Sequence, residues 1–275
     1  MALVHEAHYA GVYYPREPSL LRSEVGLALA RNHETTEWSR IGVIVAPHGP
    51  YRVVVDVYAK AYSALLGLRD VGTVVIISPD HFATGRTISI DNYDVWKLPI
   101  GYIYVDKEFA KLLAAAGGFE LGGYAVDQEH GVENQLPWIV SVFGYKTRIV
   151  PITITYAERE NLEKLAASIL FAARHLNRHI AVIATTDMTH FGDPETTMEQ
   201  DMKAMDYISR LNHTGFLDYA SESKLSWCGV PAVATAIMIA KKLGAKEARL
   251  VAYAAHRIRL GDMEKMNSYG AIVFY

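Results

Sequence analysis

The sequence predicts an α/β protein with one central sheet, largely parallel or mixed, that is covered by helices on both faces. Short β-branched runs alternate along the chain with segments of helical periodicity, which is the pattern of such a fold. No stretch rich in Pro, Gly and Ser and no block of charge divides the chain. The chain is therefore interpreted as a single domain, residues 1–275, whose 51% hydrophobic content is enough for one large core.

Six apolar runs are predicted as strands, because each is continuous, rich in β-branched residues and bounded by Gly, Pro or Asp. They are residues 41–45, 73–77, 148–154, 180–184, 249–254 and 271–274. Continuous runs of this kind are typical of strands that are buried on both faces. The edge and C-terminal strands are the ones that could run antiparallel.

Six other segments are predicted as helices, because their apolar residues recur at spacings of three and four. They are residues 20–31, 53–66, 107–115, 158–175, 199–211 and 231–243. Alternation of strands with helices favours crossover connections, and these place helices on both faces of a sheet.

Composition and missing motifs exclude several classes of protein. The formal net charge of −3 offers no concentrated basic face, so no nucleic-acid partner is expected. The apolar stretches are shorter than the roughly 18 residues of a membrane-spanning helix, and the first residues do not resemble a secretory signal. We therefore expect a cytoplasmic protein without a membrane partner. G-x-x-x-x-G-K-S/T and G-x-S-x-G motifs are absent, which argues against common nucleotide binding and serine-hydrolase chemistry.

Three of the predicted strands end in a turn that carries a histidine, namely His48, His81 or His190. A single histidine after a strand is more often a hydrogen-bonded structural residue than a ligand. In open α/β sheets, however, ligands bind beyond the carboxyl ends of the strands, so three histidines there can converge on one pocket. His48 and His81 are interpreted as following adjacent strands, and imidazole is a common ligand of zinc, iron and copper.

Cys228 is the only cysteine, so an intramolecular disulfide is excluded. One interpretation is a small buried hydrophobe that packs beside Trp227. The other is a metal ligand, because Pro231 fits the first turn of the next helix and a helix start favours a thiolate. We prefer the second interpretation, in which Cys228 is the third ligand beside His48 and His81.

Asp187 and His190 share one turn and are candidate acid–base residues. An aspartate near a histidine can fix the tautomer of the imidazole and raise its basicity. The alternative is an N-capping aspartate beside a surface histidine.

The polar run 127–135 contains a second candidate pair, His130 and Glu133. Their spacing would place both on one face of a short helix, where they could support a ligand or bind substrate. Solvated polar surface is the alternative. The remaining histidines are interpreted as structural: His5, His8, His33, His175, His179, His213 and His256.

Taken together and in order, these motifs resemble the Memo-like family, which is related to the class III extradiol ring-cleaving dioxygenases. The resemblance covers nearly the whole chain. Its motifs are Ala10-Gly11-Val12-Tyr13-Tyr14-Pro15, Ala46-Pro47-His48 with Tyr51, Ser78-Pro79-Asp80-His81, Trp96 with Pro99 and Gly101, Glu129-His130 with Glu133, Gln135, Leu136 and Pro137, Ile149-Val150-Pro151, Asp187-Met188-Thr189-His190, Cys228-Gly229 with Pro231, and Tyr269-Gly270-Ala271.

The resemblance implies a class III extradiol dioxygenase-like fold, a metal site lined by His48, His81 and Cys228, and a pocket that also contains Asp187 and His190, with His130 close by. The related dioxygenases bind Fe(II) through two histidines and a carboxylate. Cysteine stands at the carboxylate position here, and a thiolate is the softer ligand. Ring cleavage is therefore not part of what the resemblance implies.

The leading hypothesis is a metal-dependent oxidoreductase that acts on an unknown small molecule, with one Fe(II) or copper ion as cofactor and zinc as a further possibility. In this hypothesis His190, oriented by Asp187, moves a proton. One alternative is a non-enzymatic protein that uses the same crevice to bind a metal or a peptide. The other is a zinc-dependent hydrolase, since zinc with an open position activates water.

Overall fold

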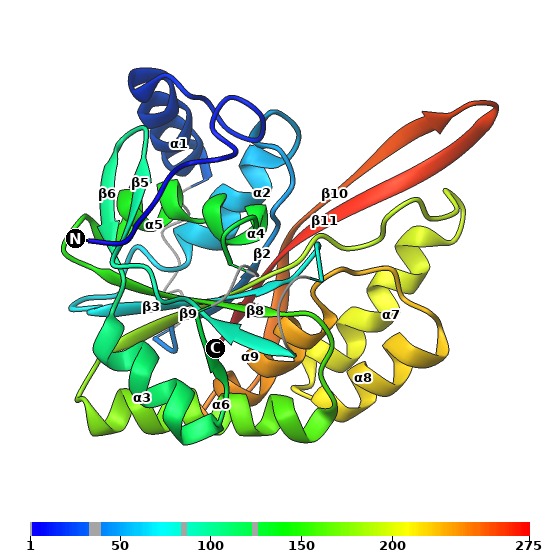
Figure 1. Ribbon diagram of the computed structural model, residues 1–275. Helices are drawn as coiled ribbons and strands as arrows, with labels where there is room; N and C mark the ends of the chain where they lie inside the picture. The colour runs from blue at the N-terminus through cyan, green and yellow to red at the C-terminus, as the bar shows by residue number, and fades with distance from the viewer. Residues whose placement is uncertain (1, 33–39, 84–86, 123–125) are drawn as a thin grey trace.

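The computed structural model describes residues 2–32, 40–83, 87–122 and 126–275 (Figure 1). Within these ranges eight strands form the main sheet. They are β2 (Val43–Ala46), β3 (Thr73–Pro79), β4 (Ile88–Ile90), β7 (Glu120–Leu121), β8 (Arg148–Ile154), β9 (Ile180–Thr185), β10 (Ala248–Leu260) and β11 (Met263–Phe274). Their order in the sheet is β10-β11-β2-β9-β3-β8-β4-β7. A smaller sheet contains β1 (Val4–His5), β5 (Val95–Leu98) and β6 (Gly101–Tyr104).

The middle of the main sheet is parallel, and its flanks are largely antiparallel. Strands β2, β9, β3 and β8 run parallel to one another. Strand β11 is antiparallel to both β2 and β10, and β4 is antiparallel to β8. The prediction of a mixed sheet with antiparallel strands at the edge and near the C-terminus is therefore confirmed.

One detail of the predicted topology is wrong. Strand β9 pairs with both β2 and β3 and lies between them, so His48 and His81 do not follow adjacent strands. The crossover through the helix before β9 inserts this later strand between two earlier ones. Order along the sequence does not fix order in a sheet whose connections are crossovers.

Nine helices of the described residues surround the main sheet. They are α1 (Pro18–Asn32), α2 (Tyr51–Ser63), α3 (Lys107–Gly117), α4 (His130–Glu133), α5 (Leu136–Phe143), α6 (Arg159–His175), α7 (Thr197–Ser209), α8 (His213–Glu222) and α9 (Val230–Leu243). Figure 1 shows α1, α2 and α5 on one side of the sheet and α3, α6 and α9 on the other. None of these helices is long and apolar enough to cross a bilayer.

The two layers of helices explain why the central strands are apolar without interruption. Along β9, Val182 and Ala184 pack in the core beside α3, α6 and α9, whereas Ala181 and Ile183 pack in the core beside α1, α2 and α5. Successive side chains of a strand point to opposite faces, so a strand with two covered faces needs apolar residues at every position. Each such run therefore predicted a strand of this sheet.

The C-terminal strands extend further than predicted. Strands β10 and β11 form a hairpin, drawn in orange and red, that projects beyond the helices (Figure 1). The predicted ranges 249–254 and 271–274 cover only the part of this hairpin at the body of the protein. Residues such as Leu260 and Met263, near the turn, are exposed, so burial imposes no apolar pattern on them.

Candidate functional site

The carboxyl edge of the parallel strands brings the predicted site residues together. His48 lies two residues beyond β2, His81 two residues beyond β3, and Asp187 two residues beyond β9. Because these strands are parallel, the three turns leave the sheet at the same edge. Cys228 comes from another direction, two residues before α9 begins.

Gly229 allows the Cys228 loop to approach the end of β9. A Cβ atom at position 229 would lie 2.4 Å from the carbonyl oxygen of Thr185, a distance that real Cβ atoms do not adopt. Its backbone N–H instead donates to the hydroxyl of Thr186 at 2.8 Å. Only glycine permits so close an approach of the two backbones.

His48, His81 and Cys228 form a cluster with the donor set of a metal site. One donor atom from each residue lies within 4.8 Å of the other two. The Cys228 Sγ atom is 3.1 Å from His48 Nε2, and the imidazole rings of His48 and His81 are nearly perpendicular, at 87°. Donor atoms around one tetrahedral zinc, iron or copper ion would be about 3.5 Å apart, given metal–nitrogen and metal–sulfur bonds of about 2.0–2.3 Å. The cluster has the size that a single ion requires.

The second nitrogen of each imidazole has a hydrogen-bond partner. His48 Nδ1 lies 3.0 Å from the hydroxyl of Thr185, and His81 Nδ1 donates to the Glu129 carboxylate at 2.9 Å. Metal-binding histidines usually hold their non-ligating nitrogen in this way, which turns the lone pair of the other nitrogen toward the ion. These contacts leave Nε2 of both residues to face the cluster, so the residues present fit a transition-metal ion.

The electrostatics of the three groups also suit a cation. Burial lowers the pKa of His48 and therefore favours the neutral imidazole that a metal needs. Burial and the nearby Asp187 carboxylate raise the pKa of the Cys228 thiol. A metal ion beside the sulfur would reverse that effect and stabilise the thiolate.

A cavity of about 400 Å³ opens in front of the cluster. It is lined by Tyr13, His48, Gly49, Pro50, His81, His130, Asp187, His190, Cys228 and Tyr269. The His130 ring lies between those of His81 and Tyr13, with centroid distances of 4.5 and 4.7 Å. The structure therefore places six of the seven predicted site residues around one cavity.

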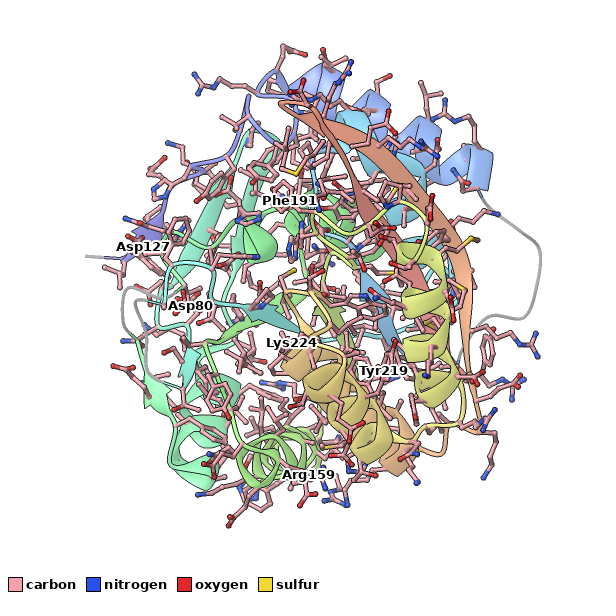
Figure 2. All side chains as sticks on the ribbon, turned by 90° about the vertical axis from the view of Figure 1, so that its right-hand side faces the viewer. Asp80, Asp127, Arg159, Phe191, Tyr219 and Lys224 are labelled. Carbon is pink, nitrogen blue, oxygen red and sulfur yellow. The ribbon has the colours of Figure 1, made fainter. Side chains whose placement is uncertain are left out.

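Asp187 and His190 both line this cavity but have different partners. Oδ1 of Asp187 accepts hydrogen bonds from the backbone N–H groups of His48 at 2.8 Å and Gly49 at 3.0 Å. The backbone N–H of His190 donates to the hydroxyl of Ser226 at 3.0 Å. The expected hydrogen bond between the two side chains does not form: Oδ1 of Asp187 is bonded to the backbone of the His48 turn, and its Oδ2 lies 3.9 Å from Nε2 of His48. His190 precedes the exposed Phe191, which Figure 2 labels.

Glu133 is the predicted residue that lies outside the cavity lining. Its buried carboxylate accepts hydrogen bonds from the hydroxyl of Tyr14 at 2.6 Å and from the backbone N–H groups of His8 and Tyr9, at 2.9 and 2.8 Å. The expected pair with His130 does not form, because Glu133 holds the N-terminal segment instead. Oε1 of Glu129 takes that place, 3.4 Å from Nδ1 of His130.

Glu129 is the residue of this site that sequence reasoning missed as a functional candidate. Besides its bond to the His81 imidazole, its carboxylate accepts the backbone N–H groups of His81 at 2.9 Å and Gly131 at 2.7 Å. A carboxylate directly before a candidate histidine was the available signal, since acidic residues commonly orient metal-binding imidazoles. Tyr13 and Tyr269 also line the cavity, but the sequence identified them only as parts of family motifs and not as site residues.

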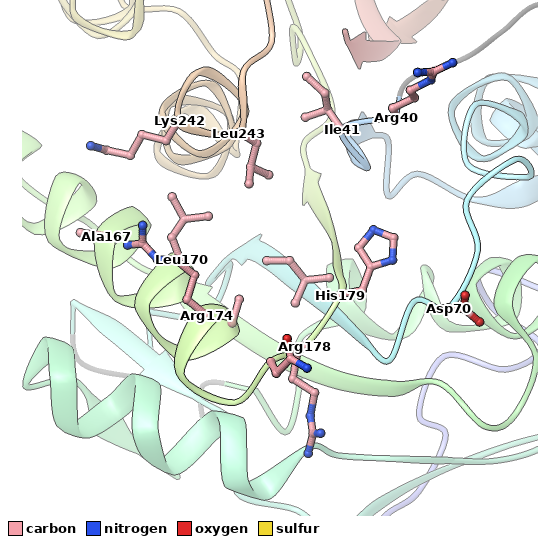
Figure 3. A pocket seen from close by; sticks show the side chains of 13 residues that line it. Arg40, Ile41, Asp70, Ala167, Leu170, Arg174, Arg178, His179, Lys242 and Leu243 are labelled. Carbon is pink, nitrogen blue, oxygen red and sulfur yellow. The ribbon is translucent and has the colours of Figure 1, made fainter.

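A larger cavity, of about 1000 Å³, lies at the opposite edge of the sheet, beside the residues that precede β2, β3 and β9 (Figure 3). Arg40, Ile41, Asp70 and His179 are among its lining residues, and none of the predicted site residues is. Figure 3 shows the Lys242 and Arg178 side chains at its rim. His33, interpreted as structural, lies outside the described residues.

Fold and site together define an α/β protein with a candidate metal site of two histidines and one cysteine at the carboxyl edge of its sheet. The family model described as "Memo-like protein" matches residues 5–273, so the chain belongs to the Memo-like family. The resemblance inferred from the motifs is thereby confirmed.

Relatives of similar length support this assignment. A MEMO1 family protein of Desulfurococcus amylolyticus is 32% identical over 275 residues, which cover 97% of each chain. A MEMO1 family protein of Methanopyrus kandleri is 30% identical over 275 residues, 96% of each chain. Among solved structures, an uncharacterized protein from Escherichia coli K12 aligns with a TM-score of 0.51 at 14% identity. That alignment covers 84% of this chain and 98% of the other, and it supports the fold alone.

Proposed function

We propose that this Memo-like protein binds one transition-metal ion through His48, His81 and Cys228 and acts as an iron- or copper-dependent oxidoreductase on a small molecule. The observation that carries the proposal is the arrangement of the two imidazoles. Each has its Nδ1 atom held by a buried neighbour, which leaves Nε2 as the free donor, and Nε2 of His48 lies 3.1 Å from the Cys228 sulfur. Hydrogen bonds that orient imidazoles in this way are typical of metal ligands and not of histidines that only pack in a core.

The site is open on the side of the cavity. Three protein donors leave at least one coordination position for a substrate, as in catalytic rather than structural sites. A thiolate is a soft donor, which favours copper and iron over hard cations. When bound, the ion would supply Lewis acidity and one-electron chemistry to a molecule in the cavity.

The chain supplies groups for proton transfer around this position. Burial and the nearby His81 lower the pKa of His190, so its imidazole is neutral at pH 7 and can accept a proton. Burial and Asp187 raise the pKa of Tyr269 to about 12, so its hydroxyl stays protonated and can donate a hydrogen bond. We assign His190 the role of proton acceptor, with His130 and Tyr269 as groups that contact and orient the bound molecule.

The test begins with metal-free protein that is loaded anaerobically with Fe(II), Cu(I) or Zn(II), one at a time. Stoichiometry is measured by elemental analysis, and oxygen uptake is followed under reducing conditions across a panel of phenols and thiols. We expect one ion per chain, and oxygen uptake that depends on substrate and requires iron or copper. His190→Ala should bind the ion and lose the uptake.

Three outcomes would contradict parts of the proposal. Hydrolysis of ester or amide substrates with zinc alone would identify a zinc hydrolase. Binding of the ion without turnover of any substrate in the panel would favour a metal- or peptide-binding protein. Failure of the wild type to bind any of the three ions would remove the metal site itself.

A further inference from the structure

Asp201, on α7, is a fully buried carboxylate that does not line the cavity. Its Oδ1 atom accepts a hydrogen bond from the hydroxyl of Thr189 at 2.7 Å and another from Nε1 of Trp227 at 2.7 Å. Thr189 directly precedes His190, and Trp227 directly precedes Cys228. One oxygen atom therefore joins the two loops that supply the proposed proton acceptor and the proposed sulfur ligand.

The second carboxylate oxygen of Asp201 accepts hydrogen bonds from the C-terminal hairpin, which is formed by β10 and β11. Oδ2 accepts from the hydroxyl of Tyr253, on β10, at 2.8 Å and from the hydroxyl of Ser268, on β11, at 2.6 Å. No Lys or Arg of the described residues forms an ion pair with this carboxylate. Four neutral donors instead replace the water that a buried carboxylate loses, and such fully satisfied networks are rigid.

The two loops are also bonded directly to each other and to the hairpin. The backbone N–H of His190 donates to the Ser226 hydroxyl at 3.0 Å, and the backbone N–H of Thr189 donates to the Ser268 hydroxyl at 2.9 Å. Asp201 thus adds a side-chain link to contacts that already join the two loops, such as the bond from the Gly229 N–H to the Thr186 hydroxyl at 2.8 Å. Contacts at several different residues restrict the movement of each loop more than a single contact would.

We propose that Asp201 is a positioning residue that fixes the His190 loop and the Cys228 loop relative to each other, and thereby sets the geometry of the metal site. The inference rests on the proposed function, because it assigns Asp201 a part in that site. A purely structural Asp201 would instead stabilise the fold without affecting the cluster.

The two oxygens of Asp201 accept hydrogen bonds from different parts of the molecule, so the donors to each oxygen can be removed separately in matched variants. Trp227→Phe removes a donor on the site side, and Tyr253→Phe removes a donor on the hairpin side. Phe216→Leu controls for packing, since the Phe216 ring lies 5.8 Å from that of Trp227 and the substitution leaves the hydrogen bond intact. Asp201→Ala removes all four bonds.

Asp201→Asn is the conservative variant. The indole N–H of Trp227 can only donate, so the amide oxygen of Asn must face it, whereas the hydroxyls of Tyr253 and Ser268 can accept from the amide NH₂. Asn can therefore preserve the site side of the network. If Asp201→Ala does not fold, the comparison of Trp227→Phe with Tyr253→Phe still tests the inference, because their donors contact different oxygens of Asp201.

The probe is Co(II), whose charge-transfer absorption reports coordination by the Cys228 thiolate, with affinity measured against a competing chelator. We expect Asp201→Ala and Trp227→Phe to bind Co(II) about 10–100-fold more weakly, the usual effect of losing a group that orients ligands. Tyr253→Phe, Phe216→Leu and Asp201→Asn should bind Co(II) with an affinity close to that of wild type, even where urea unfolding shows that the variant is less stable. Equal weakening in Trp227→Phe and Tyr253→Phe, or unchanged binding in Asp201→Ala, would overturn the inference.

A second measurement separates this inference from the proposed function. Alkylation of Cys228 by iodoacetamide in the metal-free protein needs no metal, and Cys228 is the only thiol. We expect faster alkylation in Asp201→Ala and Trp227→Phe than in wild type, Tyr253→Phe or Phe216→Leu. A wild type that binds no Co(II) would remove the proposed function, whereas equal alkylation rates in all variants would remove the positioning role.

Discussion

The Nε2 atom of His48 lies 3.1 Å from the Sγ atom of Cys228, although 180 residues separate them in the chain. Strand β2 delivers the imidazole, and the turn before α9 delivers the sulfur. No local pattern forces this contact, so it arises only when the whole sheet is formed. A contact of this kind is more informative about function than either residue alone.

Cys228→Ser should weaken metal binding strongly and leave the fold intact. A serine hydroxyl at neutral pH is a poor substitute for a thiolate donor. The loss of affinity should exceed the roughly 10–100-fold that follows loss of an orienting partner. Competition with a chelator for Fe(II), Cu(I) and Zn(II) measures it, and circular dichroism verifies the fold. Equal affinity in wild type and variant would exclude the sulfur as a ligand.

His190→Ala should keep the metal affinity of wild type and lose turnover. His190 lines the cavity but is not one of the three clustered donors, so metal affinity should stay close to wild type. Loss of a proton-transfer group should lower turnover by about 10²–10⁴-fold. Steady-state rates with the substrate found in the oxygen-uptake screen measure this effect. A large loss of metal affinity in His190→Ala would instead make His190 a ligand.

Glu129→Gln should weaken metal binding about 10–100-fold through His81. Both carboxylate oxygens accept hydrogen bonds, so the amide NH₂ of Gln must face a donor at His81 or Gly131. Glu133→Gln is the matched control, since it alters another buried carboxylate nearby that contacts the N-terminal segment. Competition with a chelator measures the metal affinity of both variants. Similar affinities for the two would show that Glu129 does not orient His81.

Gly229→Ala should lower both the metal affinity and the free energy of unfolding, the latter by about 1–3 kcal/mol. The added Cβ would lie 2.4 Å from the carbonyl oxygen of Thr185, and that strand end is fixed by its neighbours, so the Cys228 loop must move. Gly26→Ala is the control, because nothing lies within 4 Å of a Cβ at that helical position. It should be neutral or stabilising. Urea unfolding and metal titration of both variants test the pair.

His5 should make stability depend on pH between about 4 and 6.5. Burial lowers the pKa of His5 to about 4, where its ring stacks on Trp96 with centroids 3.6 Å apart. The unfolded chain takes up this proton near pH 6.5 and the folded chain only near 4, so the stabilisation present above pH 6.5 is lost as pH falls toward 4. The loss amounts to about 3 kcal/mol.

His5→Phe is the variant that isolates this effect. It keeps an aromatic ring against Trp96 and removes both the titration and the hydrogen bond that Nε2 donates to the Asp127 carbonyl. The unfolding free energy of wild type, measured relative to that of His5→Phe, should therefore fall from pH 7 to pH 4. A constant difference across this range would show that His5 titrates normally in the folded protein.

Burial decided which parts of the fold could be predicted from the sequence. Strands such as β3 were predicted because both of their faces are covered and the run from Val74 to Ile77 is apolar without interruption. Strands β5 and β6 were not, since Lys97 and Tyr102 face solvent and interrupt the pattern. The position of β9 between β2 and β3 could not be predicted, because apolar runs identify strands and not their neighbours.

The candidate site was predictable where chemistry-bearing residues follow a strand. His48, His81, Asp187 and His190 share that context, which is a local property of the sequence. The side-chain partners were not predictable, because they depend on segments far apart in the chain. Asp201 lies on a helix with no chemical motif, and only the folded structure shows that it touches the neighbours of His190 and Cys228.

The place of β11 in the sheet has a consequence for protein synthesis. This strand lies between β10 and β2, with Ile272 paired to Val45, three residues before His48. While residues 263–274 are still inside the ribosome, β2 has β9 as its one neighbour in the sheet, and both the Ser268 contact with the Thr189 backbone and the Tyr269 wall of the cavity are missing. We therefore expect the cavity to reach its final form, and the proposed ion to bind in it, only after β11 has left the ribosome.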